Sequence, residues 1–233
     1  MGTIINAYRR LNVKNTMIDI FLKYIAPHRC YGCGKVGKCL CESCKYYIIE
    51  EPFRRCLSCL KPISQKCSVC IKSYTKSWCV GELDGVIKEL IYDYKFKNLK
   101  QAFIELSDLL SASIDELEDV VVTAIPTLPN HIRRRGYDHT KLIAVRFAKL
   151  RGLKYEDTII RISKTTQHNS TASMRWKQAQ KSFTAKKVKK HIRYLLIDDI
   201  VTTGATIENA SKCLLKAGAK EVYVATIARQ TLD

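Results

Sequence analysis

The chain has 233 residues, 46% of them hydrophobic, which suffices for the core of one ordinary domain and a small module. Lysine and arginine number 40 against 22 acidic residues, a formal net charge of +18. Such a charge favours polyanionic partners such as nucleic acids or phosphate-rich ligands, although a solvated basic surface also accounts for it. No stretch approaches the roughly 20 apolar residues of a membrane span, so we expect no membrane insertion.

The N-terminal part of the chain contains one apolar stretch, MIDIFLKYIAPH, which Asp19 and Lys23 interrupt. This stretch lacks the uninterrupted apolar core and the small-residue cleavage site of a signal peptide, so we expect a cytoplasmic protein. Its apolar residues recur at helical spacing, which predicts an amphipathic helix within residues 1–26. The predicted apolar face carries Ile18, Phe21, Leu22 and Ile25.

Cysteine is unusually frequent, with 11 residues, ten of them before residue 80. Eight form four C-x-x-C pairs, and the pattern C-x-x-C, seven residues, C-x-x-C occurs twice at an offset of 26 residues. Two such pairs supply the four thiolates of a tetrahedral zinc site, and a module with few large apolar residues needs metal or disulfides to fold. We predict two structural zinc ions in a double zinc ribbon at residues 27–75. The predicted ligands are Cys30, Cys33, Cys41, Cys44, Cys56, Cys59, Cys67 and Cys70.

Two other interpretations of the cysteines are weighed against zinc. A disulfide cluster conflicts with the odd total and with a cytoplasmic location, and thiol exchange does not need four tandem C-x-x-C copies. Consecutive pairing of the knuckles gives two stacked ribbons, whereas a cross-braced pairing uses the same residues. Cys79 and Cys213 are interpreted as ordinary thiols, and so is Cys39 unless it competes for the first site.

Beyond a link at residues 71–85, strands and helices alternate. The predicted elements are two helices within 85–117 that break near Lys97–Asn98, a strand at 119–127, a helix at 139–152, a strand at 157–163, a polar basic segment at 164–190, a strand at 192–200, a helix at 204–218 and a strand at 221–228. This alternation predicts an α/β fold with a parallel sheet. Because such a sheet buries its own core, residues 76–233 are expected to fold without the cysteine module.

Two adjacent acids, Asp198 and Asp199, end the most apolar predicted strand. Ligands of open parallel sheets bind beyond the carboxyl ends of the strands. The turn Thr202–Thr206 leads into a helix N-terminus, where free amides and the helix dipole favour a phosphate. Acids beside a phosphate site are explained if they accept hydrogen bonds from sugar hydroxyls or act through a divalent cation. A ligand with a 5-phosphate and vicinal ribose hydroxyls satisfies both conditions.

This stretch resembles the motif of type I phosphoribosyltransferases that binds 5-phosphoribosyl 1-pyrophosphate (PRPP): an apolar strand, two acids, two apolar residues and T-T-G-x-T. The resemblance implies a type I phosphoribosyltransferase-like domain at 76–233, with helices on both faces of the sheet. It also implies that Asp198 and Asp199 are the catalytic acids and contact the ribose hydroxyls. The implied 5-phosphate loop comprises Thr202, Thr203, Gly204, Ala205 and Thr206.

The order of the motifs resembles one family more narrowly, the ComF/ComFC competence proteins. The double cysteine ribbon is followed by YDYKFKN, AIPTLPNHIRRRGYDH, TQHNSTASMRWKQAQKSF and the PRPP motif. The family's R-G-F-N-Q stands here as Arg135 to His139, and its R-x-x-N as Arg175 followed by Gln178. The resemblance implies a role in DNA uptake and transformation, with single-stranded DNA and proteins of the competence machinery as partners.

A phosphoribosyltransferase has to stabilise pyrophosphate as it leaves C1 of the ribose, and Mg²⁺ would neutralise that leaving group. The candidates for binding pyrophosphate are Arg133, Arg134, Arg135, Gly136, Lys95 and Arg175. His139, His168 and His191 receive no role. The alternative is a non-catalytic single-stranded nucleic-acid-binding or regulatory protein that retains the PRPP site. In that case KKVKKHIR at 186–193 and the stacking candidate Trp176 would serve the nucleic acid.

Overall fold

The computed structural model describes residues 28–50, 53–62, 67, 70, 72–162, 183–186 and 188–231. The helix predicted within 1–26, and the basic segment with His168, Arg175 and Trp176, lie outside these described residues. The chain divides into two units, Met1–Cys41 and Glu42–Asp233. No helix in the described part of the chain has the length and apolar character needed to cross a membrane.

A small hairpin forms the described part of the first unit. Its strands β1 (His28–Arg29) and β2 (Val36–Gly37) pair antiparallel across a tight turn that begins at Cys30. Cys30 N–H donates to the carbonyl of Lys35 at 2.9 Å, and Gly34 N–H donates to that of Cys30 at 2.8 Å. Gly34 has φ +73°, a conformation that favours glycine. The turn therefore has the form of a cysteine knuckle.

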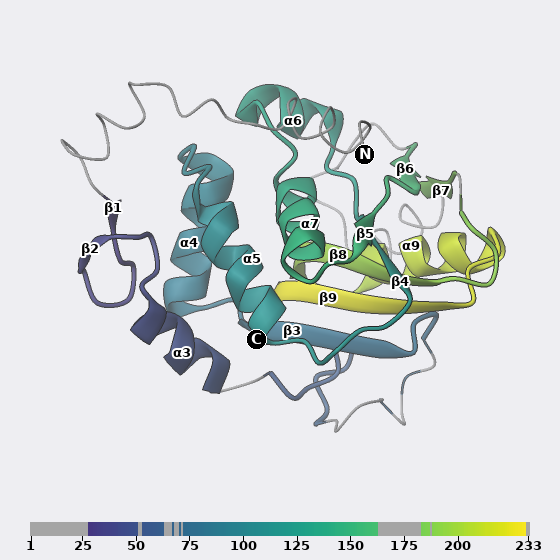
Figure 1. The fold of residues 1–233 in the computed structure, drawn as a ribbon, viewed down its shortest axis with the longest axis horizontal. Helices are drawn as coiled ribbons and strands as arrows, with labels where there is room; N and C mark the ends of the chain where they lie inside the picture. Colours follow the sequence, from purple (N-terminus) through teal and green to yellow (C-terminus); the bar gives the residue numbers. More distant parts are fainter. Residues whose placement is uncertain are drawn as a thin grey trace. The chain divides into compact units, whose positions relative to one another are not determined.

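A five-stranded sheet with the order β3-β9-β8-β4-β5 is the centre of the second unit, and all its neighbouring strands pair parallel (Figure 1). The strands are β3 (Lys76–Glu82), β4 (Val120–Ala124), β5 (Lys154–Tyr155), β8 (Arg193–Val201) and β9 (Glu221–Arg229). The two longest, β8 and β9, lie side by side and are apolar along most of their length, as buried parallel strands are. The predicted parallel α/β fold is confirmed.

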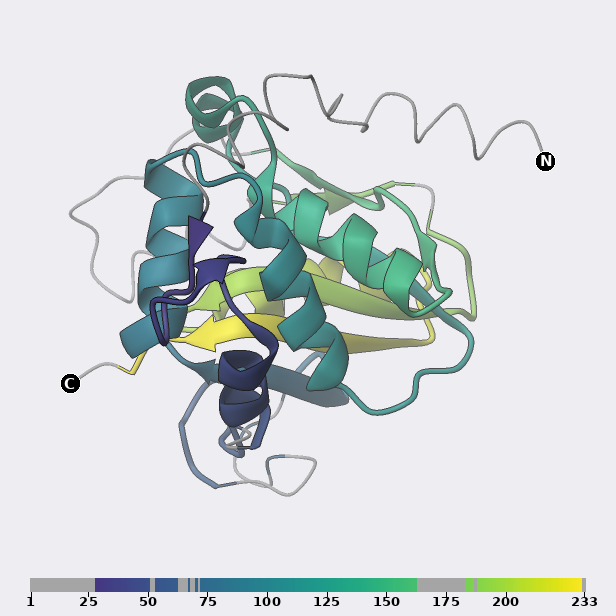
Figure 2. The ribbon, with the colours of Figure 1, turned by 60° about the vertical axis from the view of Figure 1, so that its left-hand side comes forward.

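Helices cover both faces of this sheet. They are α4 (Gly85–Phe96), α5 (Ala102–Ala112), α7 (His139–Leu150) and α9 (Ala205–Lys216); in addition, α3 (Glu42–Glu50) contacts α5 and β3, and α6 (Pro129–Arg135) follows β4 along the chain. Leu196 and Val224 share a buried cluster with Ile207 of α9, whereas the alternating neighbours Leu195 and Ile197, also buried, point to the other face. On that other face α4, α5 and α7 lie together (Figure 2).

Two expectations about strands are corrected. Residues 71–85, interpreted as a link, contain edge strand β3, whose mixed sequence KSWCVGE has no run of β-branched residues that would reveal it. The predicted strand at 157–163 does not join the parallel sheet. Its core, β6 (Ile159–Arg161), pairs antiparallel with β7 (Phe183–Ala185) in a separate two-stranded sheet. The edge of the main sheet is the short β5 instead.

The helices agree better with the sequence. The predicted break near Lys97–Asn98 is confirmed, since α4 ends at Phe96 and Asn98 has φ +56°. Helix α6 was not predicted, and it carries the arginine run. Pro129 suits its first turn, and Gly136, with φ +79°, ends it. The arginines thus occupy the last turn of a helix.

Candidate functional site

The acidic pair lies near the carboxyl end of β8, between β4 and β9 in the middle of the sheet. Asp199 is buried, and its Oδ2 lies 2.6 Å from Nζ of Lys95 and 2.6 Å from Nε2 of His139. Oδ1 of Asp198 accepts a hydrogen bond from the Asp199 amide at 2.9 Å, and Oδ1 of Asp199 accepts one from the Ile200 amide at 2.7 Å. Asp199 Oδ2 receives no well-aligned hydrogen bond from the described residues.

His139, to which sequence reasoning gave no role, is held in one tautomer. Its Nδ1 lies 2.9 Å from Nη1 of Arg135, and a guanidinium can only donate, so Nδ1 accepts. Thr127 Oγ1, 3.2 Å from the same nitrogen, donates its proton to Asp138 at 2.8 Å. The other ring nitrogen, Nε2, faces Asp199. Only the three-dimensional structure brings these residues together.

The surroundings of the two acids shift their pKa values in opposite directions. Burial, and next the negative charge of Asp199, raise the pKa of Asp198 to about 8. Burial also opposes ionisation of Asp199, but Lys95 and His139 outweigh it and hold the pKa of Asp199 far below its usual value. These shifts favour ionisation of Asp199 before that of Asp198. Paired carboxylates with separated pKa values are typical of functional sites.

The predicted phosphate loop Thr202–Thr206 follows directly from β8 and opens α9. Gly204 has φ +76° and occupies the N-cap position, and its carbonyl accepts the first helical hydrogen bond from Glu208 N–H at 2.9 Å. Thr203 Oγ1 accepts from the amide of Ala205 at 3.4 Å. The first turn of this twelve-residue helix has amides without intrahelical acceptors, which together with the helix dipole favour an anion.

The arginine run does not act as one group. Arg135 is buried against His139, with burial as the first cause of a lowered pKa of its guanidinium, whereas Arg133, Arg134 and Gly136 are exposed. Lys95, predicted to reach pyrophosphate, contacts Asp199 here. Arg175 lies outside the described residues.

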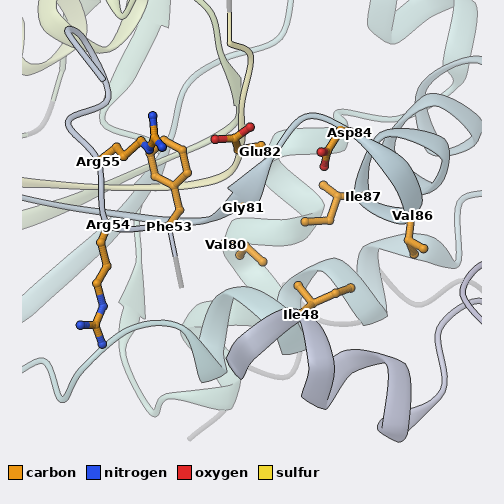
Figure 3. A pocket seen from close by; sticks show the side chains of 10 residues that line it. All are labelled: Ile48, Phe53, Arg54, Arg55, Val80, Gly81, Glu82, Asp84, Val86 and Ile87. Atoms are coloured by element: carbon orange, nitrogen blue, oxygen red, sulfur yellow. The ribbon is translucent and has the colours of Figure 1, made fainter. Parts of the chain in front are cut away.

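A separate cavity of about 450 Å³ lies at the carboxyl end of β3 (Figure 3). Its floor is apolar, with Val80 and Ile87, and its rim carries Glu82 and Arg55. Ile87 is eight residues before Lys95 on the same helix, about 12 Å along the axis at 1.5 Å per residue. The cavity therefore lies apart from the acidic pair.

The cysteines form two clusters by consecutive pairing. One holds Cys30, Cys33, Cys41 and Cys44, and the other Cys56, Cys59, Cys67 and Cys70; in each, all four sulfur atoms lie within 4.8 Å of one another. Cys59 and Cys67 Sγ are 3.7 Å apart, as are Cys33 and Cys41 Sγ. A tetrahedron with metal–sulfur bonds of about 2.3 Å has edges of about 3.8 Å, so both clusters are compatible with structural zinc. Neither of these clusters includes Cys39.

Residues 132–231 match the family described as phosphoribosyl transferase domain. This part of the chain is therefore similar to phosphoribosyl transferase domains, and two four-cysteine clusters precede it. Over 82% of its length the chain is similar to Competence protein F of Haemophilus influenzae, with 28% identity and 90% of that protein covered. It is also 26% identical, over 82% of its length, to Competence protein ComFC of Streptococcus pneumoniae, of which 88% is covered. The chain is thus similar in sequence to the ComF/ComFC proteins over most of its length, as the order of its motifs predicted.

Solved structures align less closely. The structure of the allosteric regulatory enzyme of purine biosynthesis is 22% identical, with a TM-score of 0.39. The alignment covers 54% of this chain and only 26% of that one.

Proposed function

We propose that the chain binds PRPP together with Mg²⁺ and acts as a phosphoribosyltransferase of the competence system. The observation that carries the proposal is that an acidic pair, of which Asp199 is buried, and the glycine turn that opens α9 lie next to each other at the end of β8. Carboxylate oxygens accept hydrogen bonds from ribose hydroxyls, and the amides of Thr202–Thr206 hold the 5-phosphate. The site thus matches both ends of one ligand.

The donor set fits a magnesium ion, since Mg²⁺ prefers oxygen ligands and typically takes one or two carboxylates plus substrate phosphates. Asp198 and Asp199 would hold it, because their carboxylates lie at the carboxyl end of β8 beside the glycine turn that opens α9. When bound, the ion would neutralise the departing pyrophosphate. A bound cation would favour the ionised form of Asp198, and His139, whose Nε2 lies 2.6 Å from Asp199 Oδ2, would orient that carboxylate.

The exposed guanidinium groups of Arg133 and Arg134, with the Gly136 amide, are our candidates for the pyrophosphate. Lys95 and Arg175 are proposed to assist them. Arg135 is assigned the orientation of His139 instead, because its Nη1 lies 2.9 Å from that ring.

Calorimetric titration with PRPP and Mg²⁺ tests the proposal. Asp199→Ala should weaken PRPP binding more than Asp138→Ala. Asp138 caps α7 by accepting a hydrogen bond from the Lys141 amide, accepts another from the Thr127 hydroxyl, and is not assigned to the ribose. Equal affinity of the wild type and Asp199→Ala would refute the assignment. Transfer itself is tested by pyrophosphate release with candidate acceptors.

Single-stranded DNA binding is a second proposed function, either beside catalysis or in place of it. Tyr92 and Phe96 are 54% and 52% exposed on α4, and their ring centroids are 4.9 Å apart. The guanidinium of Arg134 lies 5.9 Å from the Phe96 centroid, and Lys97 Nζ lies 5.8 Å from that of Tyr92. Exposed aromatic rings beside cations suit stacked bases and their phosphates. We also propose a cytoplasmic location and contacts with competence proteins.

A further inference from the structure

The second cysteine cluster contacts the candidate phosphate loop. Ser58 lies between ligands Cys56 and Cys59, and its Oγ is so close to Gly204 that a Cβ there would meet it at 3.0 Å. The amide of Ser58 lies 3.4 Å from Cys56 Sγ in a hydrogen bond. The position of Ser58 is therefore tied to a sulfur atom of the cluster.

A buried arginine joins the same knuckle to the strand before the loop. Arg229, 2% exposed, donates from Nε to the carbonyl of Leu57 at 2.6 Å and from Nη1 to that of Val201 at 3.4 Å. Leu57 neighbours Ser58 in the knuckle, and Val201 directly precedes the loop. A charged donor buried between two carbonyls fixes their separation, because leaving it unpaired is costly.

The far side of the cluster is bound to the loop as well. Ser73, three residues after the last ligand, donates from its amide and its hydroxyl to the Glu208 carboxylate at 3.1 and 2.8 Å. Glu208 is buried in the first turn of α9, and its own amide donates to Gly204. Segments on both sides of the cluster thus hold the turn that forms the loop.

We propose that the second cluster is a positioning element for the phosphate loop, so that metal in the cluster and a phosphate ligand in the loop bind cooperatively. The metal fixes the knuckle, since apo cysteine sites are not preformed. The knuckle fixes Ser58 against Gly204. By linkage, each ligand then raises the affinity for the other by the same factor, and such factors are typically about 5- to 150-fold. The half of the inference that concerns PRPP rests on the proposed function.

Amide hydrogen exchange of the full chain tests the positioning without any ligand. Cys59→Ser removes a ligand of the second cluster, and Cys33→Ser removes one of the first as a matched control. We expect exchange across residues 202–208 to rise about tenfold in Cys59→Ser and less than about twofold in Cys33→Ser, a difference within the usual range of coupling factors. Equal effects of the two variants would overturn the inference.

A second test keeps all eight ligands, so it does not depend on the folding of a cysteine variant. Gly204→Ala should weaken zinc binding in chelator competition by about tenfold, because its Cβ displaces Ser58. Ser58→Ala in the same chain removes the displaced oxygen and should restore most of that loss. An unchanged zinc affinity in Gly204→Ala would also overturn the inference.

PRPP then separates the two proposals. The expected result is that PRPP raises the zinc affinity of the wild type by the factor by which zinc raises its PRPP affinity. If PRPP fails to bind while zinc affinity follows the Gly204–Ser58 pair, the proposed function fails and the positioning stands. If PRPP binds with equal affinity to the zinc-loaded and the zinc-free chain, the coupling is refuted and the proposed function stands.

Discussion

Replacement of Lys95 by methionine should destabilise the protein far more than the same change at Lys97 on the same helix. Lys95 contacts Asp199 at 2.6 Å, with side chains 14% and 7% exposed. Lys97 contacts Asp93 at 3.0 Å, but its own side chain is 65% exposed. The two lysines therefore compare a buried ion pair with an exposed one.

Loss of one partner from a buried ion pair costs about 3–5 kcal/mol, because the other charge stays buried. His139 still faces Asp199, so we expect the lower end of that range, about 3 kcal/mol, for Lys95→Met. Lys97→Met should cost less than about 1 kcal/mol, as for other exposed pairs. Lys95→Met with Asp199→Asn removes both charges and should recover at least half of the loss.

Urea unfolding at several pH values is the assay. The folded state lowers the pKa of Asp199, so its contribution to stability is complete above the unfolded pKa, about 3.9, and is lost as the pH falls through the folded value. The deficit of Lys95→Met should therefore shrink below about pH 4. Equal losses for the two lysine variants, or no recovery in the double variant, would contradict the assignment of Lys95 as the counter-ion of Asp199.

Four further predictions concern metal, protons and DNA. Elemental analysis should find two zinc ions per chain, and cysteines in disulfides would refute this expectation. The folded state raises the pKa of Asp198 to about 8, so the folded chain binds this proton more tightly than the unfolded chain does. The free energy of unfolding should therefore fall as the pH rises from about 4 to 8. Asp198→Asn should stabilise the chain more at pH 8 than at pH 5, measured by urea unfolding. The affinity of the wild type for PRPP with Mg²⁺, measured by calorimetry, should rise through pH 8. The proposed site binds this ligand through the ionised carboxylate of Asp198. Phe96→Ala should weaken single-stranded DNA binding about tenfold in fluorescence anisotropy, with Tyr47→Ala as the exposed aromatic control, because stacking contributes about 1–3 kcal/mol per base.

Sequence reasoning was most successful where one short segment carries the whole signal. The C-x-x-C repeat predicted two four-sulfur clusters, and the apolar run before Asp198 predicted the central strand β8. In both cases the residues that matter are neighbours along the chain. Their spacing alone therefore limits the geometry that they can adopt.

Residues that depend on tertiary contacts left no such signal. His139 meets Asp199 from 60 positions away in the chain, and an isolated histidine in a helical segment has no distinctive pattern. Arg229 at the end of β9 continues an apolar strand, so nothing in the sequence marks it as the donor to Leu57, 172 positions away. Edge strand β3 was missed for a related reason, since pairing with β9, rather than its own composition, makes it a strand.

The expectation that the α/β domain folds without the cysteine module has to be revised for the second cluster. It assumed that the sheet buries its own core, yet Leu57 of the knuckle and Tyr74 belong to the same buried cluster as Val201 and Ile207. Arg229 is satisfied in part by the carbonyl of Leu57, so loss of the knuckle leaves both an apolar gap and a buried unpaired donor. The domain boundary between residues 75 and 76 stays a prediction from the sequence. Stability, however, is shared across it, because the residues that hold the candidate phosphate loop come from both sides.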